Sequence, residues 1–476
     1  MTPARSRYFV VMRNPGGLHD EAAAANYIAT NLFAGETIAN PPFTIAGLPS
    51  SEVSNFEPAA NHEKIVASSR SHSGQGPAWS EPEQIVVALN IGDEKHPAHE
   101  VIATIKHAIA TPPKDTPPVF LAGSPDIPFA SSDHWCVGDA ANSLFSDRSG
   151  AERLLGIDFL RKQPNVSGIG VNVVIADQGL DAAALGASYG GGWGVGNSLP
   201  GTATQTEAGS IRRSHAMMIA ENILAVAPQA KLFDLPVAPP RIANVTKFIS
   251  LAYSAYGQAF ANIQSGGVTG AAAGPWVFVN PWGILDRSTE HPLGEYTTSP
   301  NNPFNKLMVQ MVDANIDVVF AAGNCGQFCP DNRCGAKDQG PGFSIWGANS
   351  LAKVLSVGAV RADGMWLGYS AQGPGQKLLG SHKPDFCAAS QFCEDGDAFT
   401  INTGTSAACG LTAGVVAALR SRWNSTLVPP GKLQEIFGTT ARKPPGLAWN
   451  NSLGLRLGNG VLNARAAFEE LRKQFP

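Results

Sequence analysis

No window of eighteen consecutive apolar residues occurs in this sequence of 476 residues. A transmembrane helix needs about twenty such residues, so we expect neither a membrane span nor a membrane partner. The apolar run nearest the N-terminus, Tyr8 to Met12, is also too short for the hydrophobic core of a secretory signal. The sequence therefore favours a cytoplasmic location over secretion.

An excess of charge of one sign is also absent. Lys and Arg number 34 against 38 Asp and Glu, which gives a formal net charge of -4. This balance provides no electrostatic reason to bind nucleic acid. Charged residues make up 15% and hydrophobic residues 43% of the chain, which is typical of a soluble globular protein with a large core. The length suffices for two or three domains, and no internal repeat is visible.

Cysteine is sparse and odd in number, so at least one thiol is left over even if the rest pair. The seven are Cys136, Cys325, Cys329, Cys334, Cys387, Cys393 and Cys409. A cytosolic location favours reduced thiols, whereas the clustering between positions 325 and 393 favours disulfide bonds. The spacing is not that of a standard Cys-x2-Cys zinc knuckle. Disulfides, free thiols and a zinc site are three open interpretations, and a bond would join members of the 325–393 cluster.

Residues 1–110 predict a small α+β region. Tyr8 to Met12 and Ile85 to Leu89 are strand candidates. The Gly-, Ser- and Pro-rich stretch from Ala67 to Pro82 lies between them and suggests a mobile loop. A helix is expected from His96, because apolar residues after it share one face at helical spacing.

Residues 111–150 are interpreted as a Pro-rich linker and lead-in, since Thr111 to Pro118 contains four prolines. From residue 151 to 476, short apolar runs alternate with helical patterns. Strands are expected at 171–176, 231–237, 276–280, 316–322 and 354–360, and helices at 217–226, 304–312, 406–422 and 463–474. This alternation predicts an α/β fold with a parallel sheet that helices cover on both faces.

Four polar side chains fall where these elements begin or end. Asp177 directly follows the strand expected at 171–176, and Asn324 closely follows the one that ends at 322. Such positions lie at the carboxyl edge of a parallel sheet, where α/β proteins build their sites. His215 and Ser406 each head a helix, and the backbone N–H of Ser406 would point at an anion held there. Taken singly, a turn, a cap or a core residue explains each of them at least as well.

Taken together and in this order, the four stretches resemble the subtilisin-like serine protease family, the subtilases. The signatures of that family are an Asp-x-Gly strand end, a His heading a helix, an Ala-Gly-Asn turn and a Gly-Thr-Ser-x-Ala helix start. They are matched by Asp177-Gln-Gly179, Ser214-His215, Ala322-Gly-Asn324 and Gly404-Thr-Ser406-Ala-Ala408. Val279-Asn-Pro-Trp-Gly283 also resembles the substrate-binding strand.

The resemblance implies a three-layer fold and a serine endopeptidase that acts on a protein or peptide. Ser406 would attack the scissile carbonyl, His215 would take and return the proton, and Asp177 would orient the imidazole. Asn324 would donate to the developing oxyanion. The residues expected to contact substrate are Pro281, Trp282, Gly283, Ala322 and Gly323. The chemistry requires no cofactor. Structural calcium is frequent in this family, but no aspartate cluster locates it here, and no metal ligand is assigned.

The sequence departs from the family pattern beside the catalytic positions. Glu221 stands where the histidine helix commonly has a glycine. Because a buried carboxylate would need a partner, Glu221 is either exposed or supports the site from behind the catalytic residues. Gly410 and Leu411 replace the usual Pro and His after the serine. Pro281 replaces a common Ser but keeps its C=O acceptor. None of these changes removes a catalytic atom.

Two other functions compete with this interpretation. A pseudoprotease would keep the fold as a binding module, but the complete set of four residues argues against it. An esterase of the α/β-hydrolase class would need Gly-x-Ser-x-Gly and the order Ser, acid, His, whereas the order here is Asp177, His215, Ser406. Residues 1–110 are interpreted either as similar to the prosegment of such proteases or as an independent recognition domain.

Overall fold

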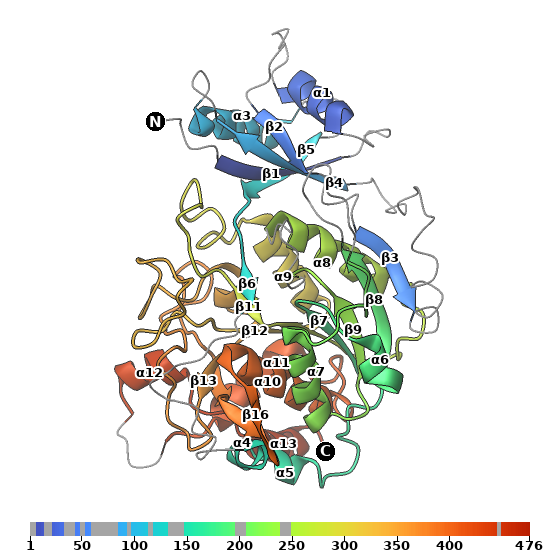
Figure 1. The fold of residues 1–476 in the computed structure, drawn as a ribbon, viewed down its shortest axis with the longest axis vertical. Coiled ribbons are helices and arrows are strands. Elements are labelled where there is room, and N and C mark those ends of the chain that lie inside the picture. The colour runs from blue at the N-terminus through green and yellow to red at the C-terminus, as the bar shows by residue number, and fades with distance from the viewer. Residues whose placement is uncertain are drawn as a thin grey trace.

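The computed structural model describes most of the chain (Figure 1). The described residues are 6–13, 21–32, 43–47, 53–58, 84–92, 97–112, 118–131, 147–195, 206–238, 249–444 and 449–476. The loop expected from Ala67 to Pro82 lies outside these ranges. In the view of Figure 1, a small N-terminal unit lies above a larger body that carries the C-terminus.

An eight-stranded sheet runs through the larger body. Seven of its strands are parallel, in the order β14 (Phe386–Ala389), β13 (Leu355–Val360), β12 (Asp317–Ala321), β10 (Trp276–Asn280), β7 (Asn172–Ala176), β9 (Lys231–Leu235) and β8 (Tyr189–Val195). β3 (Val53–Pro58) adds an antiparallel edge beside β8. Most of the parallel strands are rich in Val, Ile, Leu, Phe and Ala, as expected of strands buried on both faces.

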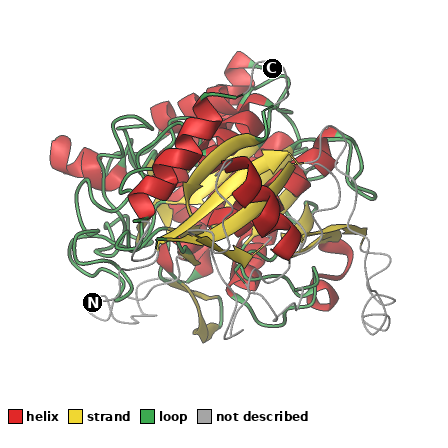
Figure 2. Ribbon diagram, turned by 90° about the horizontal axis from the view of Figure 1, so that it is seen from above, coloured by secondary structure: helices red, strands yellow, loops and turns green. Residues whose placement is uncertain are grey.

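Alternate side chains of the sheet enter two different cores. Val173 and Ile175 of β7 pack into one core, and Val174 and Ala176 pack into the other. The first core includes residues of α4 (Arg148–Leu155), α5 (Ile157–Leu160), α7 (His215–Val226), α10 (Gly404–Arg420), α11 (Pro430–Thr440) and α13 (Ala464–Gln474), and the second includes residues of α8 (Ile249–Gln264) and α9 (Pro303–Asp313). Figure 2 shows helices on both faces of the sheet. The expected three-layer α/β fold is confirmed.

The larger body also has several short elements. Among them are α6 (Ala182–Leu185), α12 (Asn451–Leu457) and the hairpin of β15 (Phe392–Glu394) and β16 (Asp397–Asn402). α10, with 17 residues, is the longest of the helices with given bounds, and no helix in the described ranges combines the length and hydropathy that crossing a bilayer requires.

The N-terminal unit is a four-stranded antiparallel sheet with two helices. Its strands lie in the order β2 (Phe43–Gly47), β4 (Gln84–Ile91), β1 (Ser6–Arg13) and β5 (Phe120–Pro125), and its helices are α1 (Glu21–Leu32) and α3 (Ala98–Ala110). Tyr8 and Val10 face the core shared with both helices. Phe9 and Val11 face the larger body, where the rings of Phe9 and Tyr253 of α8 lie 6.0 Å apart.

The strands and the helix expected in residues 1–110 correspond to β1, β4 and α3, although α3 begins at Ala98, two residues after the expected start. The sequence does not predict α1, β2 or β3. In α1, Ala24 and Ile28 are the buried hydrophobic residues among those described, so its apolar periodicity is weak. β5 lies within residues 111–150 and pairs with β1. The division of the chain at residue 110 stays a prediction.

α10 is tied to β12 at both ends. Arg420, at the end of α10, donates to both carboxylate oxygens of Asp317 at 2.6 and 2.7 Å. Thr405, at the start of α10, donates its N–H to Asn324 Oδ1 at 3.0 Å. Asp317 and Asn324 are seven residues apart, and Thr405 and Arg420 are fifteen apart. At about 3.3 Å per extended residue and about 1.5 Å per helical residue, both stretches span roughly 23 Å. The two contacts therefore fix α10 along the sheet.

Asp317→Ala should lower the free energy of unfolding by about 3–5 kcal/mol, because the Arg420 guanidinium would stay buried without its carboxylate. Both residues are 2% exposed. Asp313→Ala is the matched control, since Asp313 pairs with Lys353 and both side chains are at least half exposed. That change should cost less than about 1 kcal/mol. Urea unfolding of the two variants measures the difference, and equal losses would contradict the role given to the buried pair.

Candidate active site

The turn after β7 is bonded to the start of α7. Gln178 Oε1 accepts the His215 N–H at 2.9 Å, and the Gly179 carbonyl accepts the Ser214 hydroxyl at 2.5 Å. Gly179 has φ of +110°, and a Cβ there would lie 2.7 Å from the Ile211 side chain. The glycine of the Asp-x-Gly stretch therefore allows a turn that seats the head of α7 beside Asp177.

Asp177 and His215 form a buried pair at this junction. His215 Nδ1 and Asp177 Oδ2 lie 2.5 Å apart, with 6% of the histidine side chain and none of the aspartate side chain exposed. The other carboxylate oxygen accepts the Ser131 hydroxyl at 3.1 Å. A carboxylate on Nδ1 holds the proton on that nitrogen and fixes the ring, so that Nε2 is the basic end of the imidazole.

The packing of α10 on α7 sets the register between Ser406 and His215. A Cβ at Gly410 would lie 3.4 Å from Ile219 Cα, and a Cβ at Gly414 would lie 3.1 Å from the Ile223 carbonyl. The same step of four residues on each helix means that the two helices run in parallel. One turn earlier on both helices stand Ser406 and His215.

Ser406 is the third residue of α10 and is fully buried. Its hydroxyl donates to the Pro281 carbonyl at 3.1 Å. The first N–H groups of a helix have no intrahelical acceptor, so the backbone N–H of Ser406 belongs to a set of donors that can receive an anion. The C=O that Pro281 retains is thus in contact with the proposed nucleophile.

Asn324 is buried in the turn after β12, and Thr405 sets its orientation. Asn324 Oδ1 accepts from the backbone N and from Oγ1 of Thr405 at 3.0 and 2.9 Å. Because Oδ1 accepts both bonds, Nδ2 is the donor at the opposite branch of the amide. Thr405 Oγ1 also accepts the Gly323 N–H at 3.1 Å. Thr405 is absent from the predicted site residues, although the Gly-Thr-Ser pattern contains it.

The other expected substrate residues lie on either side of this turn. Trp282 and Gly283 form β11 (Trp282–Gly283), and Asn349 Nδ2 ties this strand to β12 by donating to the carbonyls of Trp282 and Ala321 at 2.8 Å each. Ala322 is buried in a small apolar cluster that it shares with Ile345 and Ala371. Pro281 thus contacts Ser406 through its carbonyl, and Ala322 and Gly323 directly precede Asn324 in the chain.

The departures from the family pattern have local explanations. Glu221 is exposed, so its carboxylate needs no buried partner. Partial desolvation and the nearby Glu394 carboxylate raise the pKa of Glu221, and Arg148 opposes the shift. At Gly410 a Cβ would lie 3.1 Å from Asn222 Cβ, so the small residue allows α10 to approach α7 closely.

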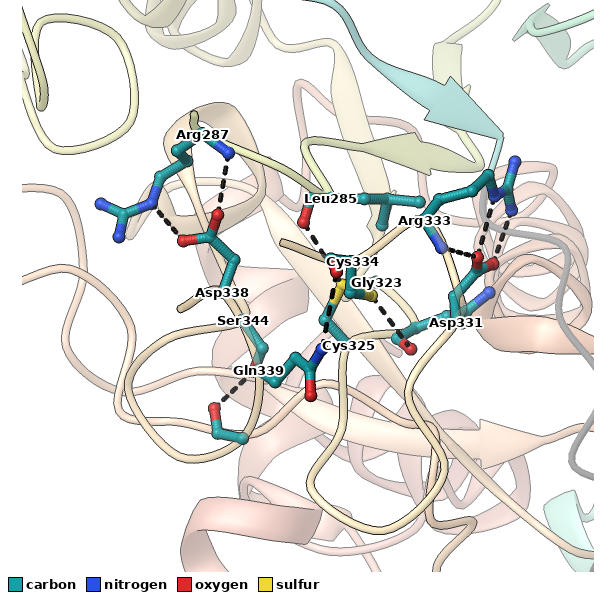
Figure 3. Close-up of a disulfide and its surroundings, with 12 residues drawn as sticks. Leu285, Arg287, Gly323, Cys325, Asp331, Arg333, Cys334, Asp338, Gln339 and Ser344 are labelled. Atoms are coloured by element: carbon teal, nitrogen blue, oxygen red, sulfur yellow. Dashed lines mark hydrogen bonds and ion pairs between the residues drawn. A yellow bond between two sulfur atoms is a disulfide. The ribbon is translucent and has the colours of Figure 1, made fainter. Parts of the chain in front are cut away.

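Cys325 and Cys334 form a disulfide next to Asn324 (Figure 3). Cys329 is also disulfide-bonded. Cys387, Cys393 and Cys409 are buried thiols, and Cys136 lies outside the described residues. The disulfide interpretation is therefore correct for Cys325 and Cys334 within the predicted cluster, and wrong for Cys387 and Cys393. In the described ranges, no group of three or more His, Cys, Asp or Glu could hold a metal ion.

The comparison with protein families identifies the class of this chain. The Peptidase_S8 model, described as the subtilase family, matches residues 168–455, which is more than half of the chain. The chain therefore belongs to the subtilase family, and the family is one of serine peptidases. A search of curated proteins finds no match.

Several solved structures share a similar chain path. MycP1 from the ESX-1 type VII secretion system is 19% identical, with 76% of this chain and 94% of that chain covered and a TM-score of 0.44. The patellamide maturation protease PatA is 19% identical, with 64% and 98% covered and a TM-score of 0.42. A serine protease of Aeromonas sobria is 14% identical, with 68% and 63% covered and a TM-score of 0.46. These are distant similarities, and the family assignment rests on the family match.

Reduction of the Cys325–Cys334 bond should lower peptidase turnover, because the bond restrains the turn that directs Asn324. The Asn324 carbonyl also accepts the Asp331 N–H at 2.9 Å within the closed ring. The double variant Cys325→Ala/Cys334→Ala, which retains Cys329, should show low turnover before any reductant is added. Initial rates with and without reductant measure this, and a double variant with the turnover of the unmodified protein would contradict it.

Proposed function

We propose that this chain is a serine endopeptidase with Asp177, His215 and Ser406 as its catalytic triad. The observation that supports the proposal is the register of α7 and α10: Ser406 and His215 each lie one turn before the contact of Gly410 with Ile219, and His215 is paired with Asp177. The substrate is a protein or peptide, in keeping with the family.

In the proposed reaction, Ser406 Oγ attacks the scissile carbonyl carbon while its proton passes to His215 Nε2. The Asp177 carboxylate stabilises the imidazolium that forms. His215 then gives the proton to the leaving amine, the C–N bond breaks, and an acyl-enzyme remains. Water repeats the sequence to release the acid product and restore Ser406.

Two donors of this chain would stabilise the tetrahedral intermediate. Asn324 Nδ2 is held by the contacts of Thr405 with Oδ1, and the second donor is the backbone N–H of Ser406. Because both are fixed before the reaction begins, little reorganisation is needed when negative charge develops on the substrate oxygen.

A peptide-binding protein with impaired catalysis is the second candidate, and one contact favours it. The Ser406 hydroxyl donates to the Pro281 carbonyl, whereas attack requires it to donate to His215. In that case the chain would bind peptides along β11 without cleaving them.

The unmodified chain should hydrolyse casein and react with a fluorophosphonate probe at Ser406. Ser406→Ala should abolish both while leaving the unfolding curve unchanged. His215→Ala should lower turnover by about as much, since the members of a triad act as a unit. Ser425→Ala removes a hydroxyl beyond the far end of α10 and serves as the control with normal activity. Hydrolysis by Ser406→Ala refutes the assignment, and an unmodified chain that is neither labelled nor active supports the binding protein.

Asn324→Ala should lower kcat by roughly a hundredfold to a thousandfold, the usual loss when one oxyanion donor is removed. KM should change little, because the amide acts mainly on the transition state. Thr405→Val should lower kcat in the same direction and by less, since it removes one of the two donors to Asn324 Oδ1. Steady-state kinetics on a peptide substrate separate the two constants. A raised KM with unchanged kcat would exclude Asn324 from the oxyanion hole.

A further inference from the structure

A two-residue strand from the N-terminal part of the chain lies beside the catalytic residues. β6 (Ala130–Ser131) pairs antiparallel with β11, and Ser131 is opposite Trp282. The Ser131 hydroxyl contacts Asp177. In Figure 1 the chain descends from the N-terminal unit to place β6 next to β11. β6 therefore shows how an extended peptide can pair with β11.

The register of β6 on β11 predicts which residue of an extended peptide would lie next to Ser406. Trp282 follows Pro281, and the Pro281 carbonyl is in contact with the Ser406 hydroxyl. In an antiparallel pair, the residue that comes after the one opposite Trp282 lies opposite Pro281. A substrate bound along β11 would thus bring the residue opposite Pro281 to Ser406, and the residue opposite Trp282 would come immediately before it.

Arg333 points at the carbonyl of the residue opposite Trp282. Its Nη2 donates to the backbone oxygen of Ser131 at 3.1 Å. The Asp331 carboxylate is buried and holds the guanidinium through Nε at 2.9 Å and Nη2 at 2.6 Å (Figure 3). Such a two-point pairing fixes the plane of an arginine side chain, so the direction of its remaining N–H groups is set as well.

We propose that Arg333 is a substrate-binding residue that donates to the backbone carbonyl immediately before the one that Ser406 attacks. The proposal rests on the endopeptidase function proposed above. Every peptide has a carbonyl at this position, so the contact recognises the peptide backbone whatever the side chain.

The Cys325–Cys334 disulfide restrains the position of Arg333 relative to Asn324, the proposed oxyanion donor. Asn324 directly precedes Cys325, and Arg333 directly precedes Cys334. The Cys325–Cys334 bond therefore links the residue that follows Asn324 to the residue that follows Arg333. Asn324 would receive the attacked carbonyl oxygen, and Arg333 would receive the carbonyl oxygen one residue earlier.

Arg333→Gln in the full chain tests the proposal by kinetics on an internally quenched peptide. KM should rise roughly tenfold, which corresponds to the loss of a hydrogen bond from a charged donor, and kcat should change far less, because the contact exists in both ground and transition states. Arg465→Gln is the matched control, since it removes an exposed Arg–Glu pair on α13. That variant should keep both constants.

A thioamide placed at the same carbonyl of the substrate tests the contact itself, because sulfur is a weaker acceptor than oxygen. The thioamide should raise KM for the unmodified chain and leave it nearly unchanged for Arg333→Gln. The two changes then fail to add, as expected of partners in direct contact.

An unchanged KM in Arg333→Gln, or a thioamide effect of equal size in both proteins, would overturn the proposal. A rise in kcat/KM would overturn it too, since Arg333 would then serve only to hold β6. These results differ from a failure of the proposed function, in which the unmodified chain itself neither cleaves the peptide nor takes the fluorophosphonate label.

Discussion

The attachment of α10 to β12 is the constraint on which the site depends. α10 and β12 run in opposite directions and match in length. A buried ion pair between Arg420 and Asp317 joins them at one end. At the other end Thr405 bonds to Asn324. Movement of α10 along the sheet would break both contacts at once. Ser406, the proposed nucleophile that follows Thr405, and the amide of Asn324 after β12 are therefore placed by the same pair of elements.

The close approach of α7 to α10 sets the position of His215 relative to α10. The contacts involve glycines of α10: a Cβ at Gly414 would lie 2.9 Å from Val226 Cβ, and one at Gly410 would lie 3.1 Å from Asn222 Cβ. The absence of these side chains lets the helices pack in parallel, and the carboxylate of Asp177 then fixes the ring of His215. The replacement of the usual proline by Gly410 is compatible with this packing, because glycine occupies even less space.

The N-terminal part of the chain contributes to the larger body in three places. β3 extends the main sheet beside β8, and β6 pairs with β11 at the candidate site. One face of β1 also packs into the core that contains α8. Residues that precede the family match thus form part of the surroundings of the proposed catalytic residues. The ring closed by Cys325 and Cys334 also belongs to these surroundings, since its Arg333 donates to the Ser131 carbonyl of β6.

By itself the sequence determined the alternation of buried strands and helices after residue 150, and the order of Asp177, His215, Asn324 and Ser406 along it. Apolar periodicity and short motifs are local properties, so they can be read without knowing what packs where. The weak apolar pattern of α1 and the brief β6 carry no such local signal.

Only the tertiary structure decided which cysteines pair, how Thr405 holds Asn324, and that Arg333 faces the strand beside β11. The spacing of these residues along the chain does not predict which of them will be in contact. Their partners are selected by the packing of helices and strands, and the register of a sheet or of two helices becomes known only when both members of the pair are in place.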